Sequence, residues 1–343
     1  MALTSLVDAA LDRSVVLGYT KVGPQLRKLW WPADPAPQSM AGKRVVVTGA
    51  TSGIGAAMAR SFAELGAAVH VLGRNPDKVR ATVEAIRSAV PGAVLVDEVC
   101  DVSDLGAVRA WTADLAGRIP ALHGLVHNAG AIPPEREESA QGHEQQLAAH
   151  VLGPHLMTAE LLPLLTAAEG ASVVFMSSGG MYTAPLVCDD MEYLDGYSGL
   201  RGYARTKRMQ VVLADAWARR VSSRRQPRDE AGEARQSDSA PGDIRVESMH
   251  PGWAETPGVT GSLPLFDKVM RPLLRDPASG ADTAVWLVAT RPESTPGHFW
   301  HDRAQRPTTF GWERGEDPAK VALFLSRVSQ KTGTANEWPG FGD

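Results

Sequence analysis

The chain has 343 residues and a formal net charge of −4, and 43% of its residues are hydrophobic and 22% charged, as in an ordinary globular protein. This charge balance gives no reason to expect a nucleic-acid partner. The two cysteines, Cys100 and Cys188, are too few for a disulfide framework or a cysteine-rich metal site, and they suit a reducing, cytoplasmic location. Neither a secretory signal nor a run of about 20 apolar residues is found, so no spanning helix is expected.

Residues 1–40 precede the main pattern of the chain. Apolar residues recur at helical spacing in the first eleven positions, which predicts a helix followed by a proline-rich linker. One interpretation is a helix packed on the surface of the main domain. The other is an interfacial anchor that brings Trp30 and Trp31 into peripheral contact with a membrane. Arg27 and Lys28 would then lie beside the two indole rings.

From residue 43 onward, short apolar runs alternate with longer amphipathic ones. Near-continuous apolar strands separated by helices predict a parallel sheet that is covered on both faces. The sequence therefore predicts an α/β fold, a doubly wound parallel sheet of the Rossmann type, in a single domain over residues 41–331. The expected strands are 43–50, 67–74, 93–99, 122–130, 172–178 and 244–252, and 297–303 could supply a seventh.

Two further segments do not fit this core. Residues 221–242 are polar and charged and have little to bury, which predicts a disordered surface insertion between a helix and the next strand. Residues 332–343 are expected to form a flexible tail.

The first expected strand ends in a glycine-rich turn, TGATSGIG, that opens a helix. Glycines permit a tight turn and let backbone N–H groups approach a pyrophosphate at the helix N-terminus. The alternative is a tight strand-to-helix turn without a ligand. The residues expected at the phosphates are Gly49, Thr51, Ser52, Gly53, Ile54 and Gly55.

Four motifs follow one another along the chain: TGATSGIG at 48–55, HNAG at 127–130, YARTK at 203–207 and HPGWAET at 250–256. Their order and spacing resemble those of the short-chain dehydrogenase/reductase superfamily, in its classical type with TGxxxGxG and YxxxK. The resemblance covers roughly residues 43–300. It implies an enzyme that uses a nicotinamide cofactor to interconvert a carbonyl and an alcohol.

The second expected strand ends in LGRN, which bears on the choice of cofactor. An acidic residue there would hydrogen-bond the ribose 2′-hydroxyl of NAD, whereas an arginine favours a 2′-phosphate. Arg74 occupies this place, so NADP(H) is the expected cofactor. The alternative is that Arg74 points to solvent at the strand end.

The resemblance also implies further cofactor contacts. Asp101 would meet the adenine amino group and Val102 would pack beside the ring. The competing interpretation makes Asp101 the N-cap of the next helix, a place for which Ser103 competes. The remaining expected cofactor residues are Asn128 of HNAG, Pro251, Gly252 and Thr256, with Tyr203 and Lys207 of YARTK.

Tyr203 and Lys207 are four residues apart, so a helix places both on one face. A tyrosine with a pKa of about 10 is a poor base, and a nearby cation favours its phenolate. The resemblance implies that Tyr203 is the general acid/base and that Lys207 lowers its pKa and holds the ribose hydroxyls. Ser178 would orient the substrate oxygen, and Ser177 is expected to satisfy neighbouring backbone. The flanking residues Arg201, Arg205 and Arg208 are expected to be solvated.

One catalytic position departs from the family pattern. AAHVLGPH places His150 where the family has an asparagine that helps to hold a water in the proton relay to the lysine. Our hypothesis is that His150 takes this place, since a neutral imidazole can both accept and donate a hydrogen bond. The alternative is a histidine that is satisfied within its helix and has no relay role.

By the resemblance, residues 253–274 form a lid over the nicotinamide, with Thr256 near the carboxamide. Its apolar members predict a lipophilic small-molecule carbonyl or alcohol, although they could instead pack the lid onto the core. Met181 and Tyr182 are expected to add to the pocket wall. No metal is expected, because His and Cys show no metal-ligand spacing. The alternative function is a catalytically weak NADP(H)-binding sensor or scaffold, and a homo-oligomer is left open.

Overall fold

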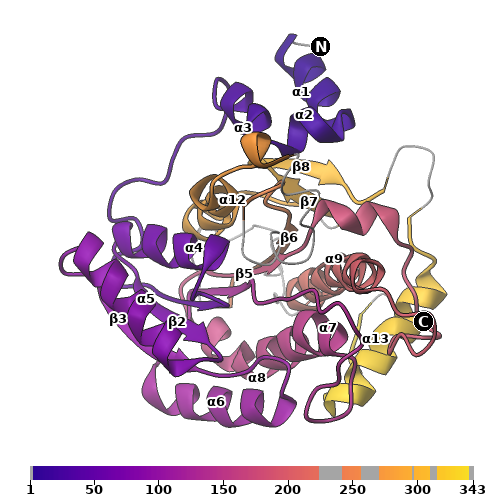
Figure 1. Cartoon of the computed structure of the whole chain (residues 1–343). Coiled ribbons are helices and arrows are strands. Elements are labelled where there is room, and N and C mark those ends of the chain that lie inside the picture. Colours follow the sequence, from indigo (N-terminus) through magenta and orange to yellow (C-terminus); the bar gives the residue numbers. More distant parts are fainter. Residues whose placement is uncertain (1–2, 224–241, 256–269, 296, 310–314, 340–343) are drawn as a thin grey trace, which may run out of the picture.

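The central feature of the structure is one twisted sheet (Figure 1). The computed structural model describes residues 3–223, 242–255, 270–295, 297–309 and 315–339. Within these residues, eight strands are ordered β3-β2-β1-β4-β5-β6-β7-β8 and run parallel except for the β7–β8 hairpin. The predicted doubly wound α/β fold is therefore confirmed. The strands are β1 Arg44–Thr48, β2 Ala68–Gly73, β3 Leu95–Val99, β4 Gly124–His127, β5 Ala171–Met176, β6 Ile244–Met249, β7 His298–His301 and β8 Ala304–Pro307.

Helices cover both faces of this sheet (Figure 1), and two separate apolar clusters result. One face packs against α4 (Gly53–Glu64), α5 (Pro76–Ala89) and α12 (Pro277–Thr290). The other packs against α6 (Leu105–Arg118), α8 (Gly153–Ala167) and α9 (Gly199–Ser223). The remaining helices are α1 Leu3–Arg13, α2 Val15–Tyr19, α3 Val22–Arg27, α7 Gln145–Leu147, the π-helix η1 Ala148–Leu152, the 3-10 helices η2 Gly179–Thr183 and η3 Arg271–Leu273, and α13 Pro318–Thr332.

The apolar runs form strands because alternate side chains reach opposite faces. In β1, Val46 joins one cluster, whereas Val45 and Val47 join the other. Strand β1 pairs with both β2 and β4, so the direction of chain winding reverses between β1 and β4. In open α/β sheets, ligands bind outside the carboxyl ends of the strands at such a switch point. The topology therefore places the candidate site there.

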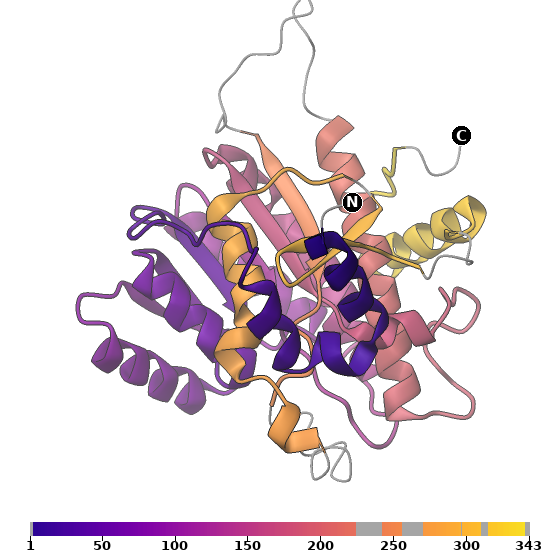
Figure 2. The same cartoon turned by 90° about the horizontal axis from the view of Figure 1, so that it is seen from above.

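The N-terminal extension is packed on the main domain beside β8 (Figures 1 and 2). Asp8 of α1 accepts hydrogen bonds from Arg306 of β8 at 2.6 and 2.9 Å and from Arg27 at 2.7 Å. Trp31 lies under the guanidinium of Arg303, 4.7 Å from its ring centroid. These contacts support the interpretation of residues 1–40 as a surface-packed helical segment. None of the helices in the described ranges is both long and apolar enough to cross a membrane.

A buried ionic cluster joins this extension to the cofactor side of the domain. Asp302, in the β7–β8 turn, accepts from Arg27 at 2.7 Å and from Arg275 at 2.6 and 3.0 Å. The guanidinium of Arg275 also donates to the carbonyl oxygens of Tyr19 at 2.9 Å and Pro251 at 3.2 Å. Burial raises the pKa of Asp302, but the two arginines outweigh it and hold that pKa below its ordinary value. The carboxylate therefore stays ionised inside the protein.

The described part of the C-terminal tail is also packed. Trp338 is buried, lies 5.4 Å from Trp217 between ring centroids, and donates from Nε1 to Ser329 Oγ. This packing at Trp338 departs from the flexible tail expected for residues 332–343, of which 340–343 lie outside the described residues. The expected insertion begins later than residue 221, because α9 extends through Ser223, and the rest of it lies largely outside the described residues.

Candidate active site

The glycine-rich turn joins β1 to α4 at the switch point. Gly49 has a φ of 64° and Gly53 a φ of 51°, both in the left-handed region that favours glycine. A Cβ atom at Gly49 would lie 2.8 Å from the Cα of Ala129, so the two segments approach too closely for a side chain. Ser52 precedes α4 without a side-chain cap, which leaves the first N–H groups of the helix for a ligand. This arrangement suits the phosphates of a dinucleotide.

Asn128 and Thr48 hold the ends of β4 and β1 together. The Asn128 amide donates to the carbonyl oxygens of Thr48 at 3.0 Å and Gly49 at 3.3 Å. Thr48 Oγ1 accepts from the backbone N–H groups of Asn128 and Ala129 at 2.9 and 3.0 Å. Asn128 thus shapes the switch point. Thr48 was missed as a site residue, although its place as the polar last residue of an apolar strand could have identified it.

A cavity of about 510 Å³ opens at this switch point. It runs from the glycine-rich turn past the ends of β2 and β3 to the start of α9, so the topology brings most of the expected cofactor residues together. The predicted residues that line it are Gly49, Thr51, Ser52, Gly53, Ile54, Gly55, Arg74, Asp101, Val102, Asn128, Tyr203, Lys207 and Pro251.

The far end of the cavity holds Arg74 and Asp101. Arg74 is exposed at the rim, where a phosphate could reach it. Asp101 Oδ1 accepts from the N–H of Ser103 at 2.9 Å and from its hydroxyl at 2.7 Å. The N-cap of α6 is Asp104, whose side chain accepts from Gly106 and Ala107. The competing interpretation of Asp101 or Ser103 as the helix cap is therefore wrong, because α6 begins at Leu105, three residues later than a cap at Asp101 requires and one residue later than a cap at Ser103 requires.

Ser178, Tyr203 and Lys207 meet at the carboxyl end of β5. Ser178 follows β5, accepts from the Gly180 N–H at 3.2 Å and makes a hydrogen bond to the Tyr203 phenol. Lys207 Nζ lies 5.3 Å from the centroid of the Tyr203 ring. Ser177 Oγ donates to the carbonyl of Lys207 at 2.8 Å, so its expected role toward neighbouring backbone is confirmed.

Burial shifts the pKa values in this group. Burial raises the pKa of Tyr203, and the hydrogen bond with Ser178 offsets only part of that rise. Burial also lowers the pKa of Lys207 to about 7, so about half of these ammonium groups carry their proton at neutral pH. In the protein alone, burial and the Ser178 hydrogen bond set the pKa of Tyr203, and the lowering by Lys207 that the resemblance implies stays a prediction. The phenol is the stable form.

His150 lies in η1 behind the cavity wall. Its ring is 5.6 Å from that of Tyr203, and its Nδ1 is 2.8 Å from Thr206 Oγ1. The Thr206 hydroxyl has one proton and donates it to the carbonyl oxygen of Tyr203 at 3.1 Å, so it can only accept from His150. We therefore assign Nδ1 of His150 as the donor and Nε2 as an acceptor. Nε2 is buried without a hydrogen-bond partner among the described residues, and it lies 2.5 Å from where a Cβ on Gly130 would be. Burial and then Lys207 hold the pKa of His150 well below its ordinary value.

The three arginines around the pair do not behave alike. Arg201 is exposed, as expected. Arg208 is buried, where it pairs with Glu316 at 2.5 Å and donates to the carbonyl of Thr308, so the expectation of a solvated side chain is wrong. Arg205 is partly buried against the ring of Tyr193, 4.2 Å from its centroid, and is also not freely solvated. Segments distant in sequence cover these two cations.

Some expected site residues lie away from the cavity. Gly252 lies behind Pro251, where a Cβ would be 2.3 Å from Arg275 Nε. Met181 packs in the core with Phe299, and Tyr182 donates from its hydroxyl to the Pro307 carbonyl at 2.6 Å. Neither of these two lines the cavity at the switch point, and their expected place in the wall of the substrate pocket stays a prediction. Thr256 and most of the expected lid, residues 256–269, lie outside the described residues.

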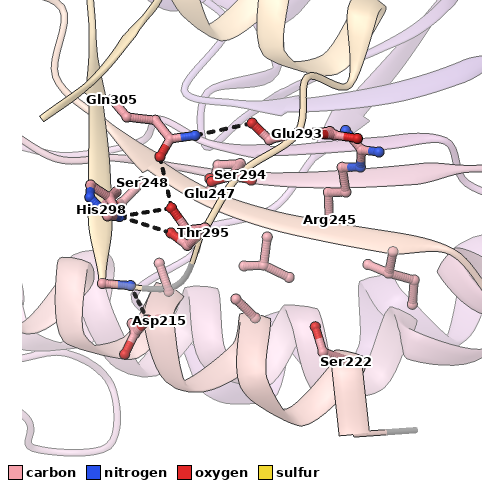
Figure 3. A pocket seen from close by; sticks show the side chains of 15 residues that line it. Asp215, Ser222, Arg245, Glu247, Ser248, Glu293, Ser294, Thr295, His298 and Gln305 are labelled. Carbon is pink, nitrogen blue, oxygen red and sulfur yellow. Dashed lines mark hydrogen bonds between the residues drawn. The ribbon is translucent and has the colours of Figure 1, made fainter. Parts of the chain in front are cut away.

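A second cavity, of about 550 Å³, lies between α9, β6 and the β7–β8 hairpin (Figure 3). It forms because β6 and β7 pair only at Met249 and Trp300, so the strands diverge toward the start of β6. Its polar side chains bind one another, as Thr295 does with His298 at 3.1 Å and Gln305 at 3.0 Å. Among the described residues, the two cavities share no lining residue. Tyr203 and Lys207 line the first cavity and not the second.

Comparisons with known proteins agree with this geometry. The family model for short chain dehydrogenases matches residues 43–187. The chain is 32% identical over 295 residues to dehydrogenase/reductase SDR family member 12 from Bos taurus, across 84% of this chain and 86% of that protein. It is 28% identical over 327 residues to retinol dehydrogenase 14 from Homo sapiens, across 88% and 90% of the two chains. A short-chain dehydrogenase structure from Shigella flexneri 2a, complexed with NADP, has a TM-score of 0.56 and 24% identity over 74% of this chain and 93% of that chain.

Proposed function

This chain belongs to the short-chain dehydrogenase/reductase family of oxidoreductases, and we propose that it reduces a lipophilic carbonyl with NADPH, using Tyr203 as the proton donor. The observation that carries this proposal is the meeting of Ser178, Tyr203 and Lys207 at the end of β5, with the last two lining the cavity. A relative named as a retinol dehydrogenase supports a lipophilic substrate.

The cavity residues fit a nicotinamide dinucleotide. The uncapped start of α4 and the close approach at Gly49 suit a pyrophosphate, and Arg74 at the rim suits a 2′-phosphate. Asp101 would face the adenine end. When bound, the cofactor supplies the hydride, and the protein contributes orientation and proton transfer.

Tyr203 supplies the proton that carbonyl reduction consumes. As hydride adds to the carbonyl carbon, the carbonyl oxygen takes the phenolic proton, and Ser178 stabilises the charge that develops on that oxygen. Because burial raises the pKa of Tyr203, the phenol holds its proton at neutral pH, the form that reduction needs. Lys207, when protonated, stabilises the phenolate left behind. The test is a panel of lipophilic ketones and aldehydes assayed by NADPH oxidation.

Replacing Arg74 with aspartate should shift cofactor preference from NADPH toward NADH. A charge-assisted contact to a phosphate is worth about 1.5–3 kcal/mol, so the ratio of kcat/KM for NADPH over NADH should fall by roughly 10- to 100-fold or more. Arg80→Asp is the matched control, because Arg80 is also exposed but does not line the cavity. A ratio that is equal in Arg74→Asp and wild type would contradict the role of Arg74.

His150 is proposed to take part in the proton relay through its unpaired Nε2. His150→Leu removes both nitrogens and should lower kcat by roughly 10- to 100-fold and change the pH profile, whereas His150→Asn should retain most activity. The measurement is kcat from pH 5 to 10. His155→Leu serves as the control, because His155 is equally buried but pairs with Thr334 in the tail. An unchanged rate and pH profile in His150→Leu would leave the histidine with a packing role only.

His150 is also the feature that favours the second candidate function, a cofactor-binding sensor or scaffold with little catalysis. In that case NADPH would bind in a fluorescence titration, but the panel would show no turnover. The presence of Ser178, Tyr203 and Lys207 in one place supports the enzyme instead.

A further inference from the structure

The ammonium group of Lys207 is held by two fixed acceptors of the protein. Nζ donates to the carbonyl of Met176 at 2.8 Å and to Oε1 of Gln210 at 2.9 Å. An ammonium has three N–H donors and no acceptor. Two fixed acceptors set its rotation, so the direction of the third N–H follows from tetrahedral geometry. Lys207 itself lines the cavity, where this third donor is available to a bound group.

Gln210 is placed by the same helix that carries the catalytic pair. It follows Lys207 by three residues on α9, so both side chains lie on one face, and it is fully buried. Its amide oxygen Oε1 must face the ammonium, because the amide NH₂ group and the ammonium are both donors and cannot hydrogen-bond each other. Its Nε2 has no hydrogen-bond partner within the described residues. A buried unpaired N–H is unfavourable, and an apolar side chain would avoid it. The favourable contact at this position is therefore the one to Lys207.

We propose that Gln210 is a positioning residue for the reaction proposed above. By accepting a hydrogen bond from Lys207, it favours the protonated form of that group and directs its third N–H into the cavity. This inference rests on the proposed function for its effect on catalysis, but the contact and its effect on Lys207 do not depend on turnover.

The surroundings of Lys207 explain why a neutral acceptor matters. No carboxylate of the described residues forms an ion pair with Lys207, and burial lowers its pKa to about 7. Tyr203 is the titratable neighbour on α9 itself, and β5 offers only carbonyl groups. The titratable groups on the other elements packed against α9 are His150 of η1, Glu144 at the start of α7, Tyr182 of η2, and Arg245 and Glu247 of β6. Of these, His150 is the group whose pKa Lys207 lowers, and it is neutral.

Two substitutions of similar size separate positioning from packing. Gln210→Met removes the acceptor, so the pKa of Lys207 should fall by roughly half to one unit. Gln210→Glu supplies a charged acceptor, so that pKa should rise by about one unit or more. The direct measurement is the NMR titration of the lysine side chains in the full-length protein, with Lys207→Arg to assign the signal. Gln146→Met, at another buried glutamine that bonds Tyr197 instead, should leave the Lys207 titration unmoved.

The second measurement is the pH profile of kcat/KM for NADPH-dependent reduction in the same variants. Its Lys207-dependent limb should move to lower pH in Gln210→Met and to higher pH in Gln210→Glu, with kcat at pH 7 roughly two- to fivefold lower in the methionine variant, in proportion to the lost protonated fraction. A Lys207 titration that stays in place in both variants overturns the proposal. Opposite shifts of that titration in the two variants support it. Failure of the proposed function is measured separately, because it would appear as undiminished turnover in Tyr203→Phe.

Discussion

Replacing Tyr203 with phenylalanine is expected to lower kcat for carbonyl reduction by roughly 10²- to 10⁴-fold, the usual contribution of a positioned general acid. The change removes only the hydroxyl, so the ring keeps its packing 5.6 Å from His150. The hydrogen bond with Ser178 is lost, and among the described residues no other tyrosine lines the cavity to replace the proton donor. NADPH affinity, measured by fluorescence titration, should stay close to wild type, because the glycine-rich turn and Arg74 are untouched.

The control for this variant is Tyr197→Phe. Tyr197 lies six residues earlier, and its hydroxyl accepts from Gln146 at 2.9 Å rather than contacting Ser178. We expect this variant to retain most of the activity. If Tyr203→Phe turned over as fast as wild type, another group would have to donate the proton. Binding of NADPH without turnover in the wild-type protein would instead favour the sensor or scaffold.

Asp302→Asn is expected to lower the free energy of unfolding by about 3–5 kcal/mol, because it leaves two buried guanidinium groups without their shared carboxylate. Asp302, Arg27 and Arg275 are all nearly inaccessible to water. Chemical denaturation of the full chain, followed by tryptophan fluorescence, measures the loss. Glu64→Gln breaks the exposed Arg60–Glu64 pair and should lower this free energy by no more than about 0.5 kcal/mol.

The effect of Asp302 should also depend on pH. Its pKa is lowered in the folded protein, so its ionised form stabilises the fold above the unfolded-state pKa near 3.8. That stabilisation is lost as the pH falls through the lower, folded-state pKa. The difference in unfolding free energy between wild type and Asp302→Asn should therefore be constant from pH 6 to 8 and shrink below about pH 4. A difference no larger than that of Glu64→Gln at pH 7 would rule out a stabilising role for the cluster.

The strands and the placement of Tyr203 and Lys207 on one helix could be predicted from local sequence, whereas elements built from polar residues could not. Strand β8 reads AQRP and has no apolar pattern, so the hairpin was missed. Its turn is formed by Asp302 and Arg303 with positive φ angles, without the glycine or asparagine that usually marks such a turn. The ion pairs to Arg27 and Arg275 hold this conformation, and those partners are distant in sequence.

The sequence by itself determined the doubly wound sheet and predicted Tyr203 and Lys207 on one helix face, because apolar periodicity and i, i+4 spacing are local properties. The choice of Ser178 and the roles expected of all three residues came from the resemblance of the motifs. Only the tertiary structure decided the state of the charges. Whether Arg208 is solvated, whether Asp302 stays ionised and which acceptor holds Lys207 depend on burial and on partners from other elements. Burial and ion pairing depend on residues that are distant in sequence, so the local sequence pattern cannot predict them.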